Sequence, residues 1–317
     1  MSGDLLTVAL AQYAPVWLNR DATLQRVLGA MEEAAEAGAE LIAFGEALVP
    51  GYPFWVELTE GARFESPLQK QWFALYSEQA VQLERGDLDP VCKLASRLKL
   101  WVVLGTIERP RERGGHSLYC SLVVIDDQGA IRNVHRKLMP TYEERLVWSP
   151  GDGHGLRSFR IGEFTLGALN CWENWMPLAR SALYAQGVDL HVAIWPGNLR
   201  NTVDITRMIA REGRSYVLSV SGLMGRAQIT DDLPEAGQLR AAMPKVAADG
   251  GSCIAEPDGE WLLAPEVGSE GLYLATLDAA KIREARQNFD PFGHYSRPDV
   301  LELQVNRQRQ CGWKVID

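Results

Sequence analysis

Residues 164–177 read Phe-Thr-Leu-Gly-Ala-Leu-Asn-Cys-Trp-Glu-Asn-Trp-Met-Pro. The apolar run 164–170 predicts a strand, and Pro177 is typical of the first residue of a helix, which we expect to run to about residue 186. Cys171 therefore lies at the end of a strand and shortly before a helix. Helix N-termini lower the pKa of a thiol and offer free N–H groups to a developing anion, so this place suits a nucleophile. The alternative is a buried cysteine that only fills space.

Strand and helix patterns alternate on both sides of this segment, and they predict a layered α/β fold. The early strand–helix–strand pattern favours parallel pairing, whereas hairpins near 118–135 and 251–277 favour antiparallel pairing, so we expect mixed sheets. We expect one domain over residues 1–317 with a short tail from about 300, and a mobile or inserted segment at about 224–249. The other expected strands are 5–11, 41–44, 100–107, 118–125, 130–135, 188–195, 216–222, 251–255, 261–264 and 272–277, and the other expected helices are 24–35, 68–83, 90–98 and 202–213.

Composition narrows the class of protein. The chain has 317 residues with 32 basic and 41 acidic side chains, a net charge of −9, and it is 46% hydrophobic, which is typical of a globular protein. The acidic balance argues against binding to nucleic acid or to an anionic membrane. The sequence predicts no membrane span and no secretory signal. Five widely spaced cysteines without a Cys-x-x-Cys pair predict a reducing compartment, the cytoplasm, and argue against a zinc site.

A nucleophilic cysteine needs a base, and a carboxylate is one candidate. Glu46 directly follows the expected strand 41–44, and crevices at the carboxyl ends of strands are where α/β proteins bind ligands. A solvated loop acid is the alternative for Glu46, and His135 and His294 are other candidate bases.

Lys137 is the third candidate, because it follows the expected strand 130–135. A lone lysine is more often a surface cation, but an ammonium beside a thiolate can stabilise a tetrahedral adduct. The loop from 136 to 155 also carries Glu143 and Glu144, and loops of about 20 residues in a compact domain are usually functional or disordered. Cysteine, glutamate and lysine at three strand ends would form an acyl-transfer centre that needs no metal.

Three segments together resemble the nitrilase, or carbon–nitrogen hydrolase, superfamily. They are Phe-Gly-Glu-Ala-Leu-Val-Pro-Gly-Tyr-Pro at 44–53, His-Arg-Lys-Leu-Met-Pro-Thr at 135–141 and Cys-Trp-Glu-Asn at 171–174. The resemblance implies a four-layer α-β-β-α sandwich with two mixed sheets. It also implies that Glu46 is the base, Lys137 the cationic partner and Cys171 the nucleophile, that Glu144 is a second glutamate of the site, and that no cofactor or metal is used.

The Cys-Trp-Glu sequence is similar to that of nitrilases and cyanide-converting enzymes rather than amidases, and segments 147–153 and 293–299 agree with this branch. The resemblance implies hydrolysis of an organic nitrile by water to a carboxylic acid and ammonia, through a thioimidate and a thioester. A cyanide hydratase, an amidase and a non-catalytic binding relative are the alternatives. The short segment after 293–299 favours a homodimer or a modest homo-oligomer over long filaments.

Aromatic residues are frequent near these motifs. They are Tyr52, Phe54, Trp55, Trp148, Trp172, Trp175 and Trp195. We expect Tyr52, Trp172, Trp195 and Pro196 to contact substrate, and an aromatic pocket favours arylaliphatic or aliphatic nitriles over cyanide.

Overall fold

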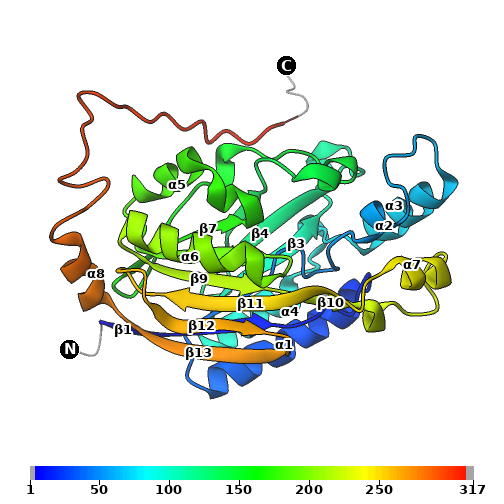
Figure 1. Cartoon of the computed structure of the whole chain (residues 1–317), viewed down its shortest axis with the longest axis horizontal. Coiled ribbons are helices and arrows are strands. Elements are labelled where there is room, and N and C mark those ends of the chain that lie inside the picture. Colours follow the sequence, from blue (N-terminus) through cyan, green and yellow to red (C-terminus); the bar gives the residue numbers. More distant parts are fainter. Residues whose placement is uncertain (1–3, 312–317) are drawn as a thin grey trace.

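The computed structural model describes residues 4–311, which form two facing β-sheets with helices on their outer sides (Figure 1). The first sheet has six strands in the order β13-β1-β2-β3-β4-β5, and the second has seven, in the order β10-β11-β9-β8-β7-β6 with β12 paired to β11. The strands are β1 (Leu5–Gln12), β2 (Leu41–Phe44), β3 (Trp101–Glu108), β4 (Tyr119–Ile125), β5 (Ile131–Arg136), β6 (Phe159–Ile161), β7 (Phe164–Asn170), β8 (Leu190–Trp195), β9 (Tyr216–Ser221), β10 (Leu223–Gly225), β11 (Val246–Ala255), β12 (Trp261–Val267) and β13 (Gly271–Asp278).

Both sheets mix parallel and antiparallel pairs. In the first sheet β1, β2 and β3 are parallel, and in the second β7, β8 and β9 are parallel. The remaining strands, including the hairpin β4–β5, pair antiparallel. Side chains alternate along each strand, so Leu6, Val8 and Leu10 of β1 join the core between the sheets while Ala9 and Ala11 face the outer helices. The expected mixed sheets are confirmed.

Helices complete four layers. Apolar side chains of α1 and α4 pack on the outer face of the first sheet, and those of α5 and α6 pack on the outer face of the second. The α-helices are α1 (Arg20–Glu36), α2 (Trp55–Leu58), α3 (Pro67–Gln79), α4 (Asp89–Leu98), α5 (Pro177–Tyr184), α6 (Leu199–Gly213), α7 (Ala236–Ala242) and α8 (Ala279–Arg286). The expected α-β-β-α sandwich is therefore confirmed.

The structure differs from the expected local structure at three places. The segment 224–249 is ordered: it contains β10, α7 and the start of β11, and its apolar side chains, such as Leu239 and Met243, are buried against α2 and α3. The helix expected over 68–83 ends at Gln79. The antiparallel pairing expected near 251–277 is confirmed for β11 and β12, but β13 does not pair with β12: it crosses to the first sheet and pairs antiparallel with β1.

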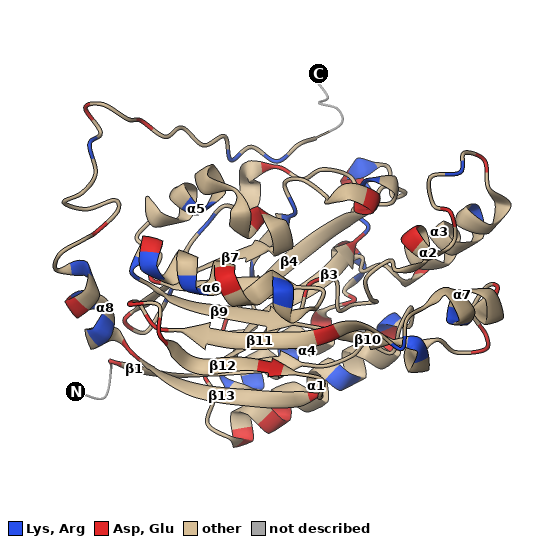
Figure 2. Ribbon diagram, viewed as in Figure 1, with Lys and Arg blue, Asp and Glu red and all other residues tan. Residues whose placement is uncertain are grey.

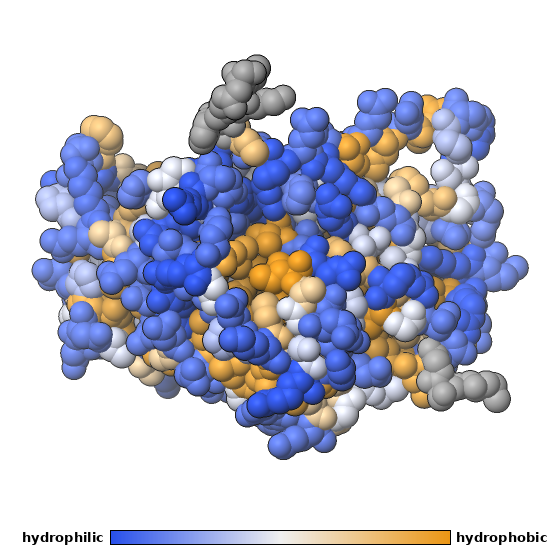
Figure 3. Space-filling view, turned by 180° about the vertical axis from the view of Figure 1, so that it is seen from behind, coloured by the Kyte–Doolittle hydropathy of each residue, from blue (hydrophilic) through white to orange (hydrophobic). Residues whose placement is uncertain are grey.

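The C-terminal segment has no helix or strand after α8 up to residue 311 and passes across the side of the molecule that carries α5 (Figure 1). Its end is held to the loop after β5, because Arg309 binds both Asp152 and the backbone oxygen of Val134. Acidic and basic residues alternate along the ribbon of the outer helices (Figure 2), and the face seen from behind gathers hydrophobic residues near its middle (Figure 3). No helix within residues 4–311 has the length and hydrophobicity that a bilayer span requires.

Candidate active site

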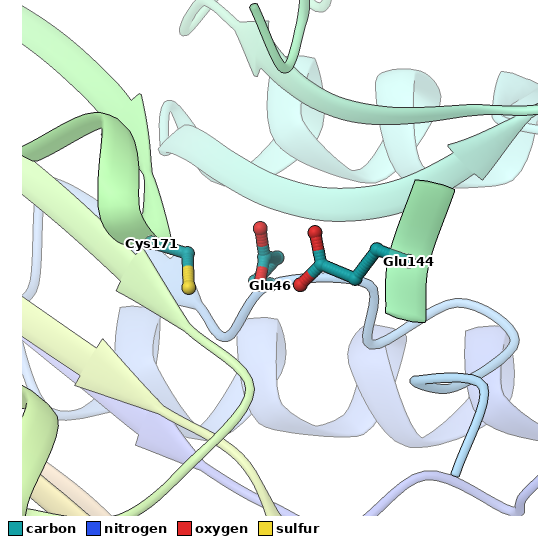
Figure 4. A group of neighbouring side chains, drawn as sticks. All are labelled: Glu46, Glu144 and Cys171. Carbon is teal, nitrogen blue, oxygen red and sulfur yellow. The ribbon is translucent and has the colours of Figure 1, made fainter. Parts of the chain in front are cut away.

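Four side chains from separate parts of the chain meet between the two sheets. Glu46 follows β2, Lys137 follows β5, Glu144 lies in the 3-10 helix Tyr142–Leu146, and Cys171 follows β7. Figure 4 shows Cys171, Glu46 and Glu144 directed toward one another, and one ligand atom from each lies within 4.8 Å of the others. The sheets are joined at this point, because the backbone N–H of Glu46 donates to the carbonyl oxygen of Trp195 over 3.0 Å.

Lys137 bridges the two glutamates. Its Nζ lies 2.8 Å from Oε1 of Glu46 and 2.7 Å from Oε2 of Glu144, and all three side chains are buried. Glu144 is fixed in turn by the backbone N–H of Thr141, at 2.6 Å, and by the hydroxyl of Tyr52, at 3.0 Å. The carboxylates and the thiol could form a metal-binding group by type, but they already surround the ammonium of Lys137. The chain itself thus supplies the positive charge at this point.

Burial sets the protonation states of the site. Burial raises the pKa of Glu46 to about 7, against the opposing effect of Lys137, and the charge of Glu144 adds to the rise. Burial on its own lowers the pKa of Lys137, but the negative charges that Cys171, Glu46 and Glu144 carry when they are ionised outweigh it and hold that pKa well above its usual value. At neutral pH the site therefore combines an ammonium with a carboxylate that readily accepts and releases a proton.

The expectation that a helix N-terminus lowers the pKa of Cys171 is wrong. Burial and then the charge of Glu46 raise this pKa well above its usual value, and Lys137 and the N–H of Trp172 offset only part of the rise. A 3-10 helix, Cys171–Trp175, separates the thiol from α5, which begins at Pro177. Cys171 has a φ of 45°, so the turn is sharp. Burial thus favours the neutral form of this thiol. A thiol has to lose its proton to act as a nucleophile.

Glu173 holds the lysine and cysteine segments together, and sequence reasoning missed this role. Its carboxylate accepts from the backbone N–H of Asn170, at 2.8 Å, and from that of Leu138. Nε2 of His135 lies 3.0 and 3.1 Å from its two oxygens. Burial alone would raise the pKa of Glu173, but His135 and these N–H groups lower it. The capping-box pattern Asn-x-x-Glu at 170–173 was the available signal.

The structure does not support either of the two histidines that were considered as bases. His135 is buried with its Nε2 on Glu173, as described above, and His294 is exposed in the C-terminal segment. Glu46 is not a solvated loop acid, and Lys137 is not a surface cation, because both are buried. The geometry thus leaves Glu46 and Glu144 as carboxylates with an oxygen within 4.8 Å of the thiol sulfur.

A pocket of about 530 Å³ opens onto Cys171 and Glu144. Of the residues expected to contact substrate, Tyr52, Trp172 and Pro196 line it, together with Phe54. Polar groups also line the pocket, and these are Glu57, Thr141, Glu143, Asn198, Arg200 and Asn201. The wall is therefore less aromatic than the sequence suggests.

Trp195 is not part of the pocket wall, contrary to expectation. Its side chain is fully buried in a cluster with Ile205 and Ile209 of α6, and its indole N–H donates to the hydroxyl of Ser219 over 3.3 Å. Trp55 and Trp148 are buried as well, and Trp175 is outside the pocket lining. The backbone of Trp195 still contributes, since its carbonyl oxygen holds Glu46.

The sequence and the fold were compared with those of known proteins. Residues 7–287 match the model of the carbon–nitrogen hydrolase family. A nitrilase of Pseudomonas syringae pv. syringae is 39% identical, over 95% of this chain and 90% of the relative, and nitrilase 2 of Arabidopsis thaliana is 34% identical, over 96% and 90%. Among solved structures, Saccharomyces cerevisiae Nit3, of the nitrilase superfamily, has a TM-score of 0.70 at 18% identity, covering 92% of this chain and 97% of its own.

Proposed function

The chain belongs to the carbon–nitrogen hydrolase family and is a hydrolase with nitrilase function, and we propose that Glu46, Lys137 and Cys171 carry out its reaction. One observation supports this most: a buried ammonium joins two carboxylates within reach of a buried thiol at a pocket. Such a group can deprotonate a nucleophile and stabilise developing negative charge without a cofactor.

The first step joins the thiol to the nitrile. The sulfur of Cys171 attacks the nitrile carbon while Glu46 takes the thiol proton and passes it to the nitrile nitrogen, which gives a thioimidate. The raised pKa of Glu46, about 7, suits a group that both accepts and donates a proton at neutral pH. Lys137 and the backbone N–H of Trp172 stabilise the negative charge that develops.

The next steps release ammonia and acid. Glu46 removes a proton from water, which adds to the thioimidate carbon to form a tetrahedral intermediate. Glu46 returns that proton to the nitrogen, and the hydroxyl proton of the intermediate then also passes to nitrogen as the carbon–oxygen double bond forms, so that the carbon–nitrogen bond breaks, ammonia leaves and a thioester remains. A second water hydrolyses the thioester, which releases the carboxylic acid and restores the thiol. Glu144 holds Lys137 in place through the 2.7 Å contact.

We propose an arylaliphatic or aliphatic nitrile as the substrate class. A pocket of about 530 Å³ has room for a drug-sized molecule, and far more than cyanide needs. Tyr52, Phe54 and Trp172 offer apolar ring surface on its wall. Turnover of cyanide much faster than that of phenylacetonitrile would refute this choice.

The test is product analysis with a panel of nitriles and their matching amides. The panel contains phenylacetonitrile, mandelonitrile, benzonitrile, a dinitrile and cyanide, and the proteins are the natural chain, Cys171→Ala and the control Cys253→Ala. Cys253 is also fully buried but lies beside Thr206, outside the active site. We expect acid and ammonia from a nitrile with the natural chain and the control, and none with Cys171→Ala. Unchanged turnover by Cys171→Ala would refute the assignment of the nucleophile.

We also propose that the chain is one domain that forms a homodimer or larger homo-oligomer in the cytoplasm. The core between the sheets draws on strands from β1 to β13, which supports a single domain. Large apolar side chains are exposed beside the site, at Trp172, Trp175, Met176 and Leu178, and a second copy could cover them. All five cysteines are free, as in a reducing compartment. Light scattering of Leu178→Glu tests the oligomer: a mass equal to that of a natural-chain oligomer would contradict this surface.

A further inference from the structure

A second buried cysteine touches the catalytic group. Cys120 lies on β4, and its Sγ is 3.4 Å from Oε1 of Glu46, to which the thiol donates a hydrogen bond. Its side chain is buried, and its carbonyl oxygen accepts from the backbone N–H of Lys137 over 2.8 Å. One residue thus contacts both the glutamate and the lysine of the proposed reaction.

The hydrogen bonds of Glu46 are divided unevenly between its two oxygens. Oε1 receives both Nζ of Lys137 and the thiol of Cys120, whereas Oε2 is buried with no hydrogen-bond partner among residues 4–311. A buried carboxylate oxygen without a partner is costly in a resting protein. It is the oxygen free to accept a proton from the nucleophile or from water.

We propose that Cys120 is a positioning residue of the reaction: its S–H group binds Oε1 of Glu46 and thereby leaves Oε2 free to accept the proton of Cys171. This proposal rests on the proposed function of Glu46 as the base. The thiol has a second effect, because a hydrogen bond to a carboxylate favours the charged form. Cys120 thus helps Glu46 to remain an anion inside a buried site.

Cys120 itself remains a neutral donor. Burial, and then the charge of Glu46, raise the pKa of this thiol well above its usual value. The other titratable groups that act on Glu46 are Lys137, Glu144 and Cys171 at the site and the more distant Tyr52 and Tyr76. All of these remain when only Cys120 is changed, so a change in the pH profile reports the thiol.

The experiment compares Cys120→Ala and Cys120→Ser with the matched control Cys253→Ala, by measuring kcat and kcat/KM for one nitrile from pH 5 to 9. Cys120→Ala removes the hydrogen-bond donor to Glu46. The apparent pKa of the acid limb in the pH profile of kcat/KM should therefore rise by about half to one pH unit, a small shift because a thiol is a weak donor. Cys120→Ser keeps a hydroxyl group as donor, so the apparent pKa of its acid limb should equal that of the natural chain or lie below it. Cys253→Ala should leave it unchanged.

A role in packing alone gives a different pattern. Both Cys120 variants would then lower kcat or the thermal unfolding midpoint while the acid limb stayed in place, and that result overturns the proposal. An acid limb that moves equally in Cys120→Ala and Cys120→Ser also overturns it. Glu46→Gln separates this failure from failure of the proposed function: an inactive Glu46→Gln with unmoved limbs in both Cys120 variants refutes only the role of Cys120, whereas an active Glu46→Gln refutes both.

Discussion

Gly105 on β3 provides a test of how tightly the position of Glu46 is held. A Cβ atom at residue 105 would lie 2.1 Å from the carbonyl oxygen of Gly45, 2.7 Å from Cα of Glu46 and 2.8 Å from the backbone nitrogen of Ala47. All three are backbone atoms, so no side chain can rotate away to make room. Gly105→Ala must therefore push the backbone that carries Glu46 away from β3.

The size of the effect follows from these distances. A separation below 3.0 Å is essentially never adopted by a Cβ atom, so the backbone must move by about 1 Å. The Lys137–Glu46 contact is 2.8 Å, and such a shift breaks it or turns it out of line. A misplacement of about 1 Å can cost about 100-fold in rate, and overpacking a core costs about 1–3 kcal/mol. We expect both losses in Gly105→Ala.

The assay measures kcat/KM with a nitrile and the thermal unfolding midpoint for Gly105→Ala and for the control Gly29→Ala. Gly29 is exposed in the middle of α1, and an added Cβ there meets no atom within 4 Å. The control should keep full activity and gain about 0.5–1 kcal/mol, because alanine favours a helix over glycine. Full activity in Gly105→Ala would show that the site tolerates displacement of Glu46 and would refute the reasoning.

Three further predictions concern other parts of the site. The kcat/KM of the natural chain should rise with pH along an acid limb near pH 7, because Glu46 must lose its proton to act as a base; a limb near pH 4.5 in a pH titration would contradict this. Glu173→Gln keeps the size of the side chain, but one of the two oxygens that accept from the backbone N–H groups is replaced. It should lower kcat more than it changes KM, and chemical unfolding should show a loss of about 1–3 kcal/mol in stability. Unchanged values would exclude a positioning role. Arg200→Ala removes an exposed cation from the pocket wall, so KM should rise up to about fivefold for a nitrile that carries a carboxylate and not for a neutral one, and equal changes would count against contact with substrate.

The sequence was sufficient to predict where the proposed catalytic side chains lie along the strands. Glu46, Lys137 and Cys171 each follow a strand, and strand ends can be predicted from apolar runs because those runs are bounded by polar residues. The placement of Glu144 depended on the resemblance to a family, since it lies in a 3-10 helix within an irregular loop that has no periodic pattern.

The direction of side chains at strand ends could not be predicted in the same way. Ile194 and Trp195 are neighbours at the end of β8, and alternation places one toward the other sheet and one toward α6. Both faces of this strand are buried, so the sequence does not indicate which residue faces which side. The direction in which the pKa of Cys171 shifts could not be predicted from the sequence either, because it depends on burial by segments that are distant in the chain.

The most direct test of the central claim is mass spectrometry of enzyme that is quenched with acid during turnover of an arylaliphatic nitrile, followed by peptide mapping. The mechanism predicts an adduct on Cys171 with the mass of the thioimidate or the thioester. This adduct should be absent from Cys171→Ala, and the amount that accumulates in Glu46→Gln should differ from that in the natural chain. An adduct on another residue, or the same adduct in Cys171→Ala, would contradict the proposed role of this cysteine.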